Sequence, residues 1–251
     1  MRTLALVTGA SRGLGRNTAL AIARGGGDVV VTYRGSADEA TAVVADIEAL
    51  GRRAVALQLD TGEVDAFPAF VTRLRTALRD TWQRETFDHL VNNAGHGDTA
   101  PIADTTVAQF DRLVDVHFKG VFFLTQALLP LIADGGRIVN ISTGLTRFAY
   151  PGYAAYAAAK AAVETLSVYM TKEFGARGIA VNTLAPGAIE TDFGGGVVRD
   201  NADVNAQLAG ITALGRVGVA DDIGPMIAAL LGEANRWVNA QRIEVSGGQA
   251  I

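Results

Sequence analysis

Short apolar runs rich in β-branched residues alternate with longer stretches of helical periodicity from one end of the chain to the other. Strand-like runs of this kind, apolar on both faces and separated by helices, indicate βαβ units, because a parallel sheet must be covered on both sides. The strand candidates are Leu4–Thr8, Val29–Tyr33, Ala54–Leu59, His89–Asn92, Arg137–Ile141, Ile179–Leu184 and Arg242–Val245. The helical candidates are Gly13–Arg24, Ala37–Leu50, Asp65–Trp82, Thr106–Ile132, Tyr153–Phe174 and Ala220–Leu231. We therefore expect an α/β fold, a single doubly wound Rossmann-type domain over residues 1–251, with a seven-stranded, mostly parallel sheet and helices on both faces.

Composition narrows the class of protein. Hydrophobic residues make up 49% and charged residues 19% of the chain, as in globular proteins. The net charge of −4 gives no general attraction to nucleic acid or to anionic lipid. Without cysteine there can be no disulfide and no thiolate metal site, and we expect no metal. The sequence has neither the pattern of a signal peptide nor an apolar run of membrane-spanning length, so we expect a cytoplasmic protein.

One segment, residues 187–214, departs from the alternation of strands and helices. It contains Gly194-Gly195-Gly196 and few apolar anchors, and it follows the sixth predicted strand. Ligands of open α/β sheets bind beyond the carboxyl ends of the strands, so this segment is placed to cover a substrate. The alternative is an ordinary surface loop.

A glycine-rich loop, Thr8–Gly15, joins the first strand to the first helix. Its glycines permit a tight turn and a close approach of backbone to a pyrophosphate, which then lies on the free N–H groups of the helix. The residues expected to contact a dinucleotide here are Gly9, Ser11, Arg12, Gly13, Leu14 and Gly15. A strand–helix turn without a ligand is the alternative.

The end of the second strand bears on the choice of dinucleotide. NAD-binding proteins usually place an acidic residue there for the ribose hydroxyls, whereas a 2′-phosphate requires a cation. This strand ends in Tyr33-Arg34 without an acid, and Arg12 lies in the glycine loop. Two guanidinium groups can hold a phosphate, so the sequence favours NADP(H) over NAD(H). Alternatively, Arg34 is a solvated charge at the end of a strand.

Two further strand ends carry candidate cofactor contacts. Asp60 follows the third strand and can accept a hydrogen bond from the adenine amino group. Asn92–Gly95 follows the fourth, where Asn93, Ala94 and Gly95 bring polar and small residues beside the cofactor. Turn chemistry alone also explains these residue types.

Tyr156 and Lys160 lie four residues apart on a predicted helix, hence on one face. A free phenol has a pKa of about 10, which is too high for easy proton exchange at neutral pH. A nearby ammonium favours the phenolate and lowers that pKa, so the two residues can act as an acid–base pair. Chance produces this spacing occasionally, so the assignment depends on further residues.

Ser142 follows the fifth strand, at the edge where this fold places its chemistry. Its hydroxyl can hydrogen-bond a substrate carbonyl and orient it for hydride attack. A cap or turn serine is the alternative. No G-x-S-x-G elbow surrounds any serine, which argues against a serine hydrolase.

Together these motifs resemble the short-chain dehydrogenase/reductase family over essentially the whole chain, with bacterial enzymes similar to 3-oxoacyl-carrier-protein reductase as the nearest in pattern. The matching segments are Thr8–Gly15, Asp60, Asn92–Gly95, Ser142, Tyr156-x-x-x-Lys160 and Pro186-Gly187-x-Ile189-x-Thr191. The resemblance implies NADP(H)-linked hydride transfer with a carbonyl or secondary alcohol, and a homotetramer or homodimer. It also implies catalytic roles for Tyr156, Lys160 and Ser142. Further cofactor contacts are implied for Asn93, Tyr156, Lys160, Pro186, Gly187, Ile189 and Thr191.

His117 departs from the family pattern. The family commonly has an asparagine there, which helps hold a water that passes protons to the lysine. An imidazole can bind water or titrate near neutral pH, so His117 is a candidate for the same relay. It is equally well explained as a packed helix histidine.

The substrate side is less defined by the sequence. We expect Ser142–Phe148, Tyr150, Tyr153, His96 and Phe193 to line it. Arg147 either pairs with an anionic substrate group or is a surface arginine. The mixture of aromatic and small residues suggests a moderately apolar small molecule.

Functions of other classes fit less well. A dinucleotide-binding regulator that has lost catalysis would explain His117, but Ser142, Tyr156 and Lys160 argue against it. A nucleic-acid-binding protein would need a basic stripe, which an acidic chain of this kind lacks.

Overall fold

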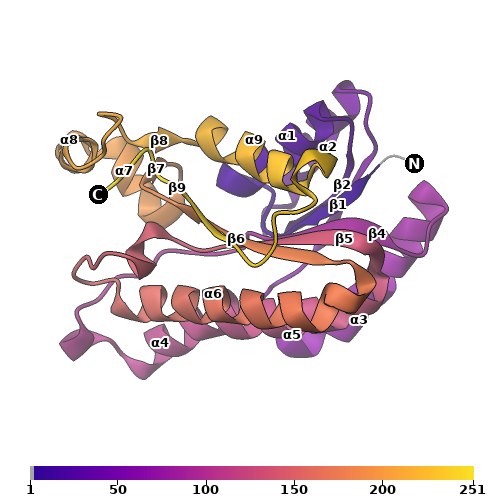
Figure 1. Cartoon of the computed structure of the whole chain (residues 1–251), viewed down its shortest axis with the longest axis horizontal. Helices are drawn as coiled ribbons and strands as arrows, with labels where there is room; N and C mark the ends of the chain where they lie inside the picture. Colours follow the sequence, from indigo (N-terminus) through magenta and orange to yellow (C-terminus); the bar gives the residue numbers. More distant parts are fainter. Residues whose placement is uncertain (1–2) are drawn as a thin grey trace.

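A twisted sheet of seven parallel strands forms the centre of the computed structural model, which describes residues 3–251 (Figure 1). Its order is β3-β2-β1-β4-β5-β6-β9, so the strand order reverses between β1 and β4. The strands are β1 Leu4–Val7, β2 Asp28–Tyr33, β3 Ala54–Gln58, β4 Phe87–Asn92, β5 Ile132–Ile141, β6 Ala180–Pro186 and β9 Arg242–Val245. Every pairing in this sheet is parallel, which confirms the predicted doubly wound fold. Reversals of this kind open a crevice at the carboxyl ends of the strands.

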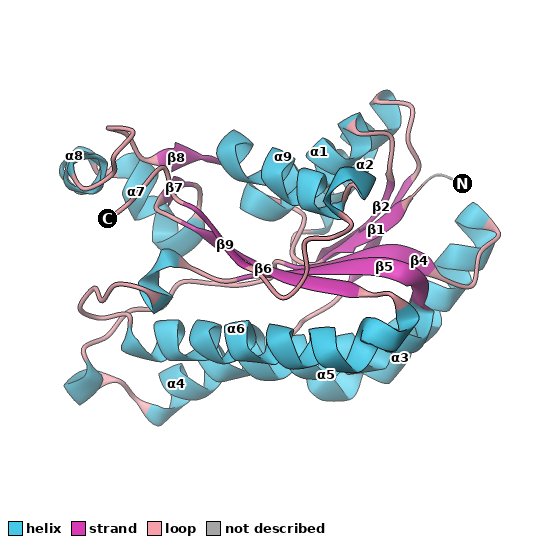
Figure 2. Ribbon diagram, in the orientation of Figure 1, coloured by secondary structure: helices cyan, strands magenta, loops and turns pink. Residues whose placement is uncertain are grey.

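Helices cover both faces of the sheet (Figure 2). One layer consists of α1 Gly13–Arg24, α2 Ala37–Ala49 and α9 Ala220–Leu231. The other consists of α3 Phe67–Ala77, α4 Val107–Val114, α5 Gly120–Leu128 and α6 Ala154–Phe174. A turn of π-helix over Asp115–Lys119 joins α4 to α5.

Alternation along the strands explains why both layers form. In β1, Ala5 and Val7 pack into the core beneath α1 and α9, while Leu4 and Leu6 pack into the core with α3 and α5. Successive side chains of a strand point to opposite faces, so a strand that is apolar at every position buries both.

Buried polar contacts tie the central strands to α6. Asn92 Nδ2 donates to Asn140 Oδ1 at 2.8 Å, and Asn140 Nδ2 donates to Ser167 Oγ at 2.8 Å. Thr183 Oγ1 donates to the same Ser167 oxygen at 2.9 Å. Unpaired polar groups are costly in a core, so this chain of bonds favours one register of β4, β5 and β6 against α6.

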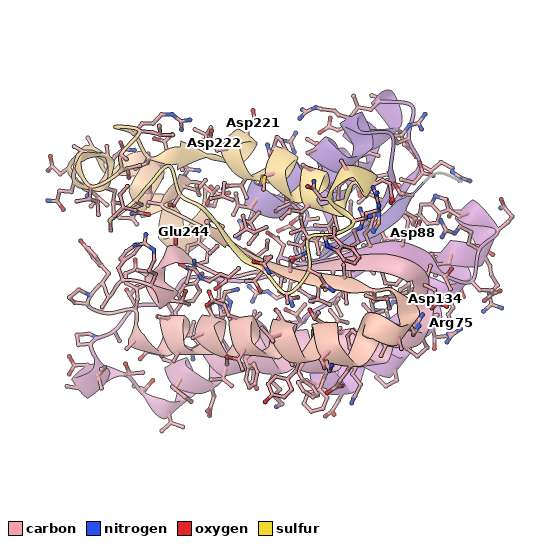
Figure 3. All side chains as sticks on the ribbon, viewed as in Figure 1. Arg75, Asp88, Asp134, Asp221, Asp222 and Glu244 are labelled. Carbon is pink, nitrogen blue, oxygen red and sulfur yellow. The ribbon has the colours of Figure 1, made fainter. Side chains whose placement is uncertain are left out.

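The segment 187–214 contains small elements that the sequence patterns did not indicate. Strand β7 (Ile189–Glu190) pairs with β8 (Gly218–Val219), and α7 (Val197–Asp200) and α8 (Ala202–Gly210) follow the glycine run. This segment and Glu244 lie toward the carboxyl ends of the strands, whereas Asp88 and Asp134 lie toward the opposite end (Figure 3).

Candidate functional site

A cavity of about 570 Å³ opens at the carboxyl ends of the central strands. Residues from the glycine loop, the ends of β3–β6, helix α6 and segment 187–214 line it together. The residues that the sequence assigns to the site and that line this cavity are Gly9, Ser11, Arg12, Gly13, Leu14, Gly15, Arg34, Asp60, Asn93, Ala94, Gly95, His117, Ser142, Tyr156, Lys160, Pro186, Gly187, Ile189 and Thr191. Tyr33 is different, because its side chain packs against the core on the α1 face and does not line the cavity.

The glycine loop has the geometry of an anion cradle. Gly9 and Gly13 have φ values of 61° and 55°, a conformation that other residues rarely adopt. A Cβ atom on Gly15 would overlap the carbonyl oxygen of Gly9, so the loop closes only around glycine. The first turn of α1 holds no acidic residue, and its N–H groups and helix dipole favour a negative charge. These features fit the pyrophosphate of a dinucleotide.

Asn93 fixes the shape of this cradle. Its Nδ2 donates to the carbonyl oxygen of Thr8 at 2.9 Å, while Thr8 Oγ1 accepts the backbone N–H groups of Asn93 and Ala94, each at 2.9 Å. Asn92 points away, into the buried chain of bonds with Asn140. The turn after β4 is thereby tied to the turn after β1.

Two cations and one carboxylate line the far end of the cavity. Arg12 and Arg34 both lie there, together with Ser36, and β2 ends without an acidic residue. Asp60 also lines the cavity and accepts the backbone N–H of Gly62 at 2.9 Å. Two guanidinium groups in a cavity wall are suited to bind a phosphate group.

Tyr156 and Lys160 share one face of α6, as their spacing predicts. Burial raises the pKa of the Tyr156 phenol, and a hydrogen bond with the Thr143 side chain opposes this by stabilising the phenolate. Burial lowers the pKa of Lys160 to about 8. Lys160 Nζ lies 5.9 Å from the centroid of the Tyr156 ring and donates to the carbonyl oxygen of Ile141 at 2.8 Å. The ammonium is thus held beside the phenol.

Thr143 lines the same cavity as Tyr156, and its hydroxyl is the one whose hydrogen bond opposes the rise in the pKa of the phenol. The sequence predicts a carbonyl-binding role for Ser142. In the structure, the Ser142 hydroxyl donates a hydrogen bond to Glu164 Oε1 at 2.6 Å. The reason is strand alternation: Asn140 and Ser142 both point toward α6, where they meet Ser167 and Glu164. Sequence reasoning missed Thr143, although extending that alternation past Ile141 would have separated the two adjacent hydroxyls.

His117 is fully buried and packs edge-on against Tyr156, with ring centroids 5.0 Å apart. Its Nε2 lies 2.8 Å from the carbonyl oxygen of His96, a contact that requires a proton on Nε2. Nδ1 has no hydrogen-bond partner among residues 3–251. Burial and the positive charge of Lys160 lower the pKa of His117 well below its usual range. The imidazole is therefore neutral at physiological pH.

Aromatic rings form the substrate side of the cavity. Phe193 lies 5.7 Å and Tyr153 lies 6.5 Å from Tyr156, and Tyr150 lies 6.1 Å from Tyr153, between ring centroids. His96 and Phe148 also line the cavity, as the sequence predicts. This wall is suited to a flat, apolar molecule.

Arg147 does not face the cavity with a free charge. Its Nε and Nη2 donate to the two carboxylate oxygens of Glu244 at 2.8 and 2.6 Å. Nη2 and Nη1 also donate to the carbonyl oxygens of Gln249 and Ala250. These contacts favour a structural role over pairing with a substrate anion.

The described residues include neither a membrane-spanning helix nor a cluster of metal-ligating side chains. None of the helices formed by residues 3–251 has the length and apolar character needed to cross a membrane. Within the same residues, no group of three or more His, Asp or Glu side chains is arranged to hold a metal ion.

Comparison with known proteins gives consistent matches over nearly the whole chain. The family described as enoyl-(acyl carrier protein) reductase matches residues 9–250. An NADPH-dependent aldehyde reductase-like chloroplastic protein of Arabidopsis thaliana is 35% identical, covering 98% of this chain and 93% of the relative. The structure of the promiscuous reductase LugOII, which catalyses keto-reduction at C1 in lugdunomycin biosynthesis, has a TM-score of 0.93 at 37% identity and covers 99% of this chain and 98% of the other. The angucycline C-6 ketoreductase LanV with bound NADP has a TM-score of 0.94 at 34% identity, with 99% and 95% covered.

Proposed function

The chain belongs to the short-chain dehydrogenase/reductase family of oxidoreductases, and we propose that it reduces uncharged aromatic ketones with NADPH. One observation carries the proposal: the Tyr156 phenol is hydrogen-bonded with Thr143 and lies beside Lys160. All three residues line the cavity that extends from the aromatic side chains to the glycine loop. A proton donor, a carbonyl-binding hydroxyl and a dinucleotide site thus converge on one place.

The choice of NADP(H) over NAD(H) is supported by charge. Arg12 and Arg34 would hold the 2′-phosphate, and β2 offers no carboxylate to repel it. When bound, NADPH supplies the hydride. The glycine loop would hold the pyrophosphate, Asp60 the adenine, and Ile189 with Thr191 the nicotinamide carboxamide.

Tyr156 delivers the proton in this proposal. Its phenol gives a proton to the carbonyl oxygen as that oxygen gains negative charge, while the Thr143 hydroxyl donates a hydrogen bond to the same atom. The Lys160 ammonium stabilises the resulting phenolate across the 5.9 Å separation from the ring. Ser142 takes no direct part, because Glu164 holds its hydroxyl.

His117 serves as a neutral packing group in this account. Its ring fills the space beside Gly95, where a Cβ atom would come within 2.7 Å of His117 Cε1. Because its pKa is lowered well below the usual range, the ring does not exchange protons by titrating near neutral pH. Of the two interpretations open from the sequence, the packed helix histidine is the one we propose.

A flat aromatic ketone fits the substrate side best. Tyr150, Tyr153, Phe148 and Phe193 offer ring faces and edges, and Arg147 is engaged by Glu244 and cannot bind an acyl-carrier phosphate. Two of the similar structures are of the ketoreductase LanV, described as an angucycline and a landomycin C-6 ketoreductase, and one of them was solved with NADP and rabelomycin. Segment 187–214 supplies Phe193 and would act as the lid over the substrate.

The alternative of a catalytically impaired regulator has less support. A chain that is no longer selected for catalysis is expected to lose a buried lysine beside a buried tyrosine, because burial disfavours the charged form of the lysine. We also propose a cytoplasmic homo-oligomer, a homotetramer or homodimer, as the family resemblance implies.

Steady-state kinetics test the proposed function. We expect α-tetralone, a fused-ring ketone, to be reduced with NADPH at a kcat/KM at least about 10-fold above that with NADH. Tyr156→Phe should bind NADPH normally but lose turnover at least about 100-fold. A preference for NADH would refute the cofactor assignment. NADPH binding without Tyr156-dependent turnover of any ketone would favour the regulator.

A further inference from the structure

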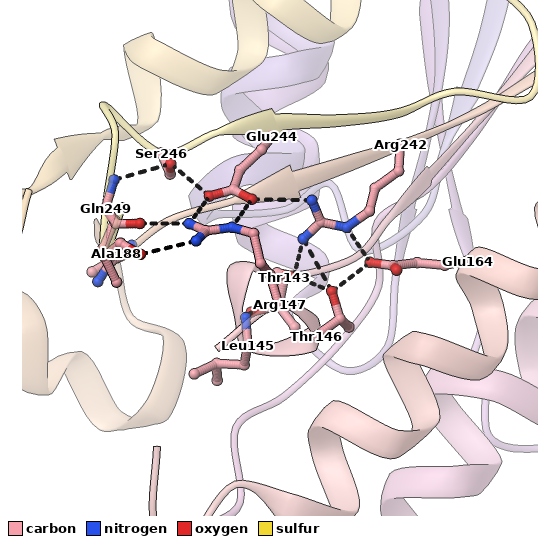
Figure 4. A network of polar contacts seen from close by, with 11 residues as sticks. Thr143, Leu145, Thr146, Arg147, Glu164, Ala188, Arg242, Glu244, Ser246 and Gln249 are labelled. Atoms are coloured by element: carbon pink, nitrogen blue, oxygen red, sulfur yellow. Dashed lines mark hydrogen bonds and ion pairs between the residues drawn. The ribbon is translucent and has the colours of Figure 1, made fainter. Parts of the chain in front are cut away.

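A carboxylate on α6 organises the turn that carries Thr143. Glu164 lies one helical turn beyond Lys160, and its Oε1 accepts three hydrogen bonds. Figure 4 shows its contacts with Thr146 and Arg242. The donors are Ser142 Oγ at 2.6 Å, Thr146 Oγ1 at 2.7 Å and Arg242 Nε at 2.8 Å. Two of these donors flank Thr143 in sequence, so Glu164 holds the turn on both sides of it.

Arg242, on the edge strand β9, holds the same turn from the other direction. Its Nη2 donates to the carbonyl oxygen of Thr143 at 3.2 Å and to Thr146 Oγ1 at 3.0 Å. Its Nη1 donates to Glu244 Oε2 at 3.0 Å. The guanidinium therefore connects the backbone of Thr143 to two carboxylates, and charge-assisted bonds of this kind are the strong ones.

The contacts continue from Glu244 to the cavity loop. Glu244 binds Arg147, which in turn binds the carbonyl oxygens of Gln249 and Ala250. Gln249 Oε1 accepts the backbone N–H of Ala188 at 2.9 Å, next to Gly187 in the cavity wall. Hydrogen bonds and ion pairs, relayed through short stretches of backbone, thus connect the turn after β5 to the loop after β6.

We infer that Glu164 is a positioning residue for the reaction, which acts by engaging Ser142 and Thr146 so that Thr143 alone faces Tyr156. The inference rests on the proposed role of Thr143. The ladder between β5 and β6 ends one residue past Ile141, with the bond from the Ser142 N–H to the carbonyl oxygen of Leu184 at 2.7 Å; among residues 3–251 no backbone bond of this kind is made by the Thr143 N–H. Without Glu164, the adjacent hydroxyls of Ser142 and Thr143 would be free to exchange roles, and the carbonyl-binding hydroxyl would be lost for part of the time.

A double-mutant cycle in kcat tests this coupling. Glu164→Ala should lower kcat for α-tetralone about 10-fold, with the Kd for NADPH changed by less than about 2-fold, because the glycine cradle is untouched. In the Thr143→Ala background the same substitution should lower kcat by less than about 2-fold, because its effect passes through Thr143. Glu164→Gln, which keeps an accepting oxygen, should recover part of the loss. Glu173→Gln, on the exposed side of the same helix, is the matched control.

Each failure is distinguishable. If Thr143→Ala keeps the wild-type kcat, the proposed function of Thr143 is wrong. If Thr143→Ala loses turnover but Glu164→Ala lowers kcat equally in both backgrounds, Glu164 has a general structural role and the inference is refuted. If Glu164→Ala fails to fold, Arg242→Gln gives an independent test, because it removes the contact with the Thr143 carbonyl oxygen while leaving Glu164 in place. Its effect on kcat should likewise be smaller in the Thr143→Ala background than in the wild type.

Discussion

Aromatic side chains surround Tyr156, and burial among them makes its phenolate form energetically unfavourable. His117, Tyr153 and Phe193 lie within 5.0, 6.5 and 5.7 Å of its ring centroid, and burial raises the pKa of the phenol. The hydrogen bond with Thr143 opposes this rise in pKa, and Lys160 Nζ lies 5.9 Å from the ring centroid. The proposed reaction therefore relies on a lysine whose charged form is disfavoured by burial.

Lys160→Met should separate stability from activity. Burial lowers the pKa of Lys160 from 10.5 to about 8. Below pH 8 the side chain is protonated in the folded state, and burial of this charge lowers the free energy of unfolding. We expect the variant to gain about 1–3 kcal/mol in free energy of unfolding at pH 7 while losing turnover. Urea denaturation at several pH values measures this.

The pH dependence of that gain has a definite sign. Because the folded-state pKa is the lower one, wild-type stability should rise between pH 8 and 10.5, and the advantage of the variant should shrink over the same interval. A variant less stable than wild type at pH 7 would contradict the assignment of a buried, charged Lys160.

His117→Asn should leave the pH profile of kcat/KM unchanged between about pH 6 and 9. Burial and Lys160 hold the pKa of His117 well below its usual range, so no ionisation of this ring falls in that window. Loss of packing can lower the rate uniformly, by about 2–5-fold. An inflection near pH 6.5 that disappears in the variant would establish a titrating relay instead.

At this scale the sequence could locate the acid–base pair but not its partner. Tyr156 and Lys160 follow from helical spacing, which is local. Ser142 and Thr143 are adjacent hydroxyls that only strand alternation continued past Ile141 would separate, and the partner that engages Ser142, Glu164, lies 22 residues away along the chain. Tyr33 is a similar case, because packing against the α1 face removes it from the cavity.

Among the elements, segment 187–214 shows most clearly what patterns cannot predict. Helix α7 has four residues and α8 nine, too short to be stable on their own or to show a clear period. Their order comes from contacts such as Asn201, whose Oδ1 accepts the N–H groups of Asp203 and Val204, each at 3.1 Å. Most of the longer elements bury wide apolar faces and were predicted to within about two residues. The clearest exception is β5, which begins at Ile132, five residues before its predicted start and at a residue that was assigned to the preceding helix.

Gly196→Ala should disturb the substrate side of the site alone. Gly196 precedes α7 with φ of 78°, and a Cβ atom there would come within 2.5 Å of Asp200 Oδ2. The strain is about 1–2 kcal/mol, and we expect a severalfold rise in KM for the ketone with an unchanged Kd for NADPH. Gly210→Ala is the control, since nothing lies within 4 Å of its added Cβ. Equal effects of both substitutions, or none, would argue against a lid.

At the scale of the whole molecule, an exposed apolar surface lies on α5 and α6. Phe122, Phe123, Val168 and Tyr169 are 38%, 38%, 51% and 64% exposed, which is unusual for large apolar side chains on neighbouring helices. Exposed large apolar side chains are suited to contacts with other proteins, and a second copy of the chain is the occupant that we propose.

Light scattering after gel filtration measures this assembly. We expect a dimer or tetramer, and the double variant Val168→Glu/Tyr169→Glu should shift it toward smaller species, because two carboxylates would be buried at the contact. Leu50→Glu, at the exposed end of α2, is the control and should leave the mass unchanged. A wild-type monomer at tens of micromolar would refute the proposal.

The parallel sheet and both helical layers could be predicted because they depend on periodicity repeated over the whole chain. The arrangement of the site depends on single contacts between distant residues, such as Arg242 with Glu164 and Arg147 with Glu244. Such pairs leave no local pattern in the sequence.

The central claim, that Thr143 and Tyr156 act together on the substrate carbonyl, is tested most directly by comparing two alanine variants. With NADPH and α-tetralone, Thr143→Ala should lower kcat/KM at least about 100-fold, because it removes the hydroxyl that binds the developing oxyanion. Ser142→Ala should lower it by no more than about 3-fold, since that hydroxyl binds Glu164. A reversed order, with Ser142→Ala inactive and Thr143→Ala close to wild type, would contradict the account.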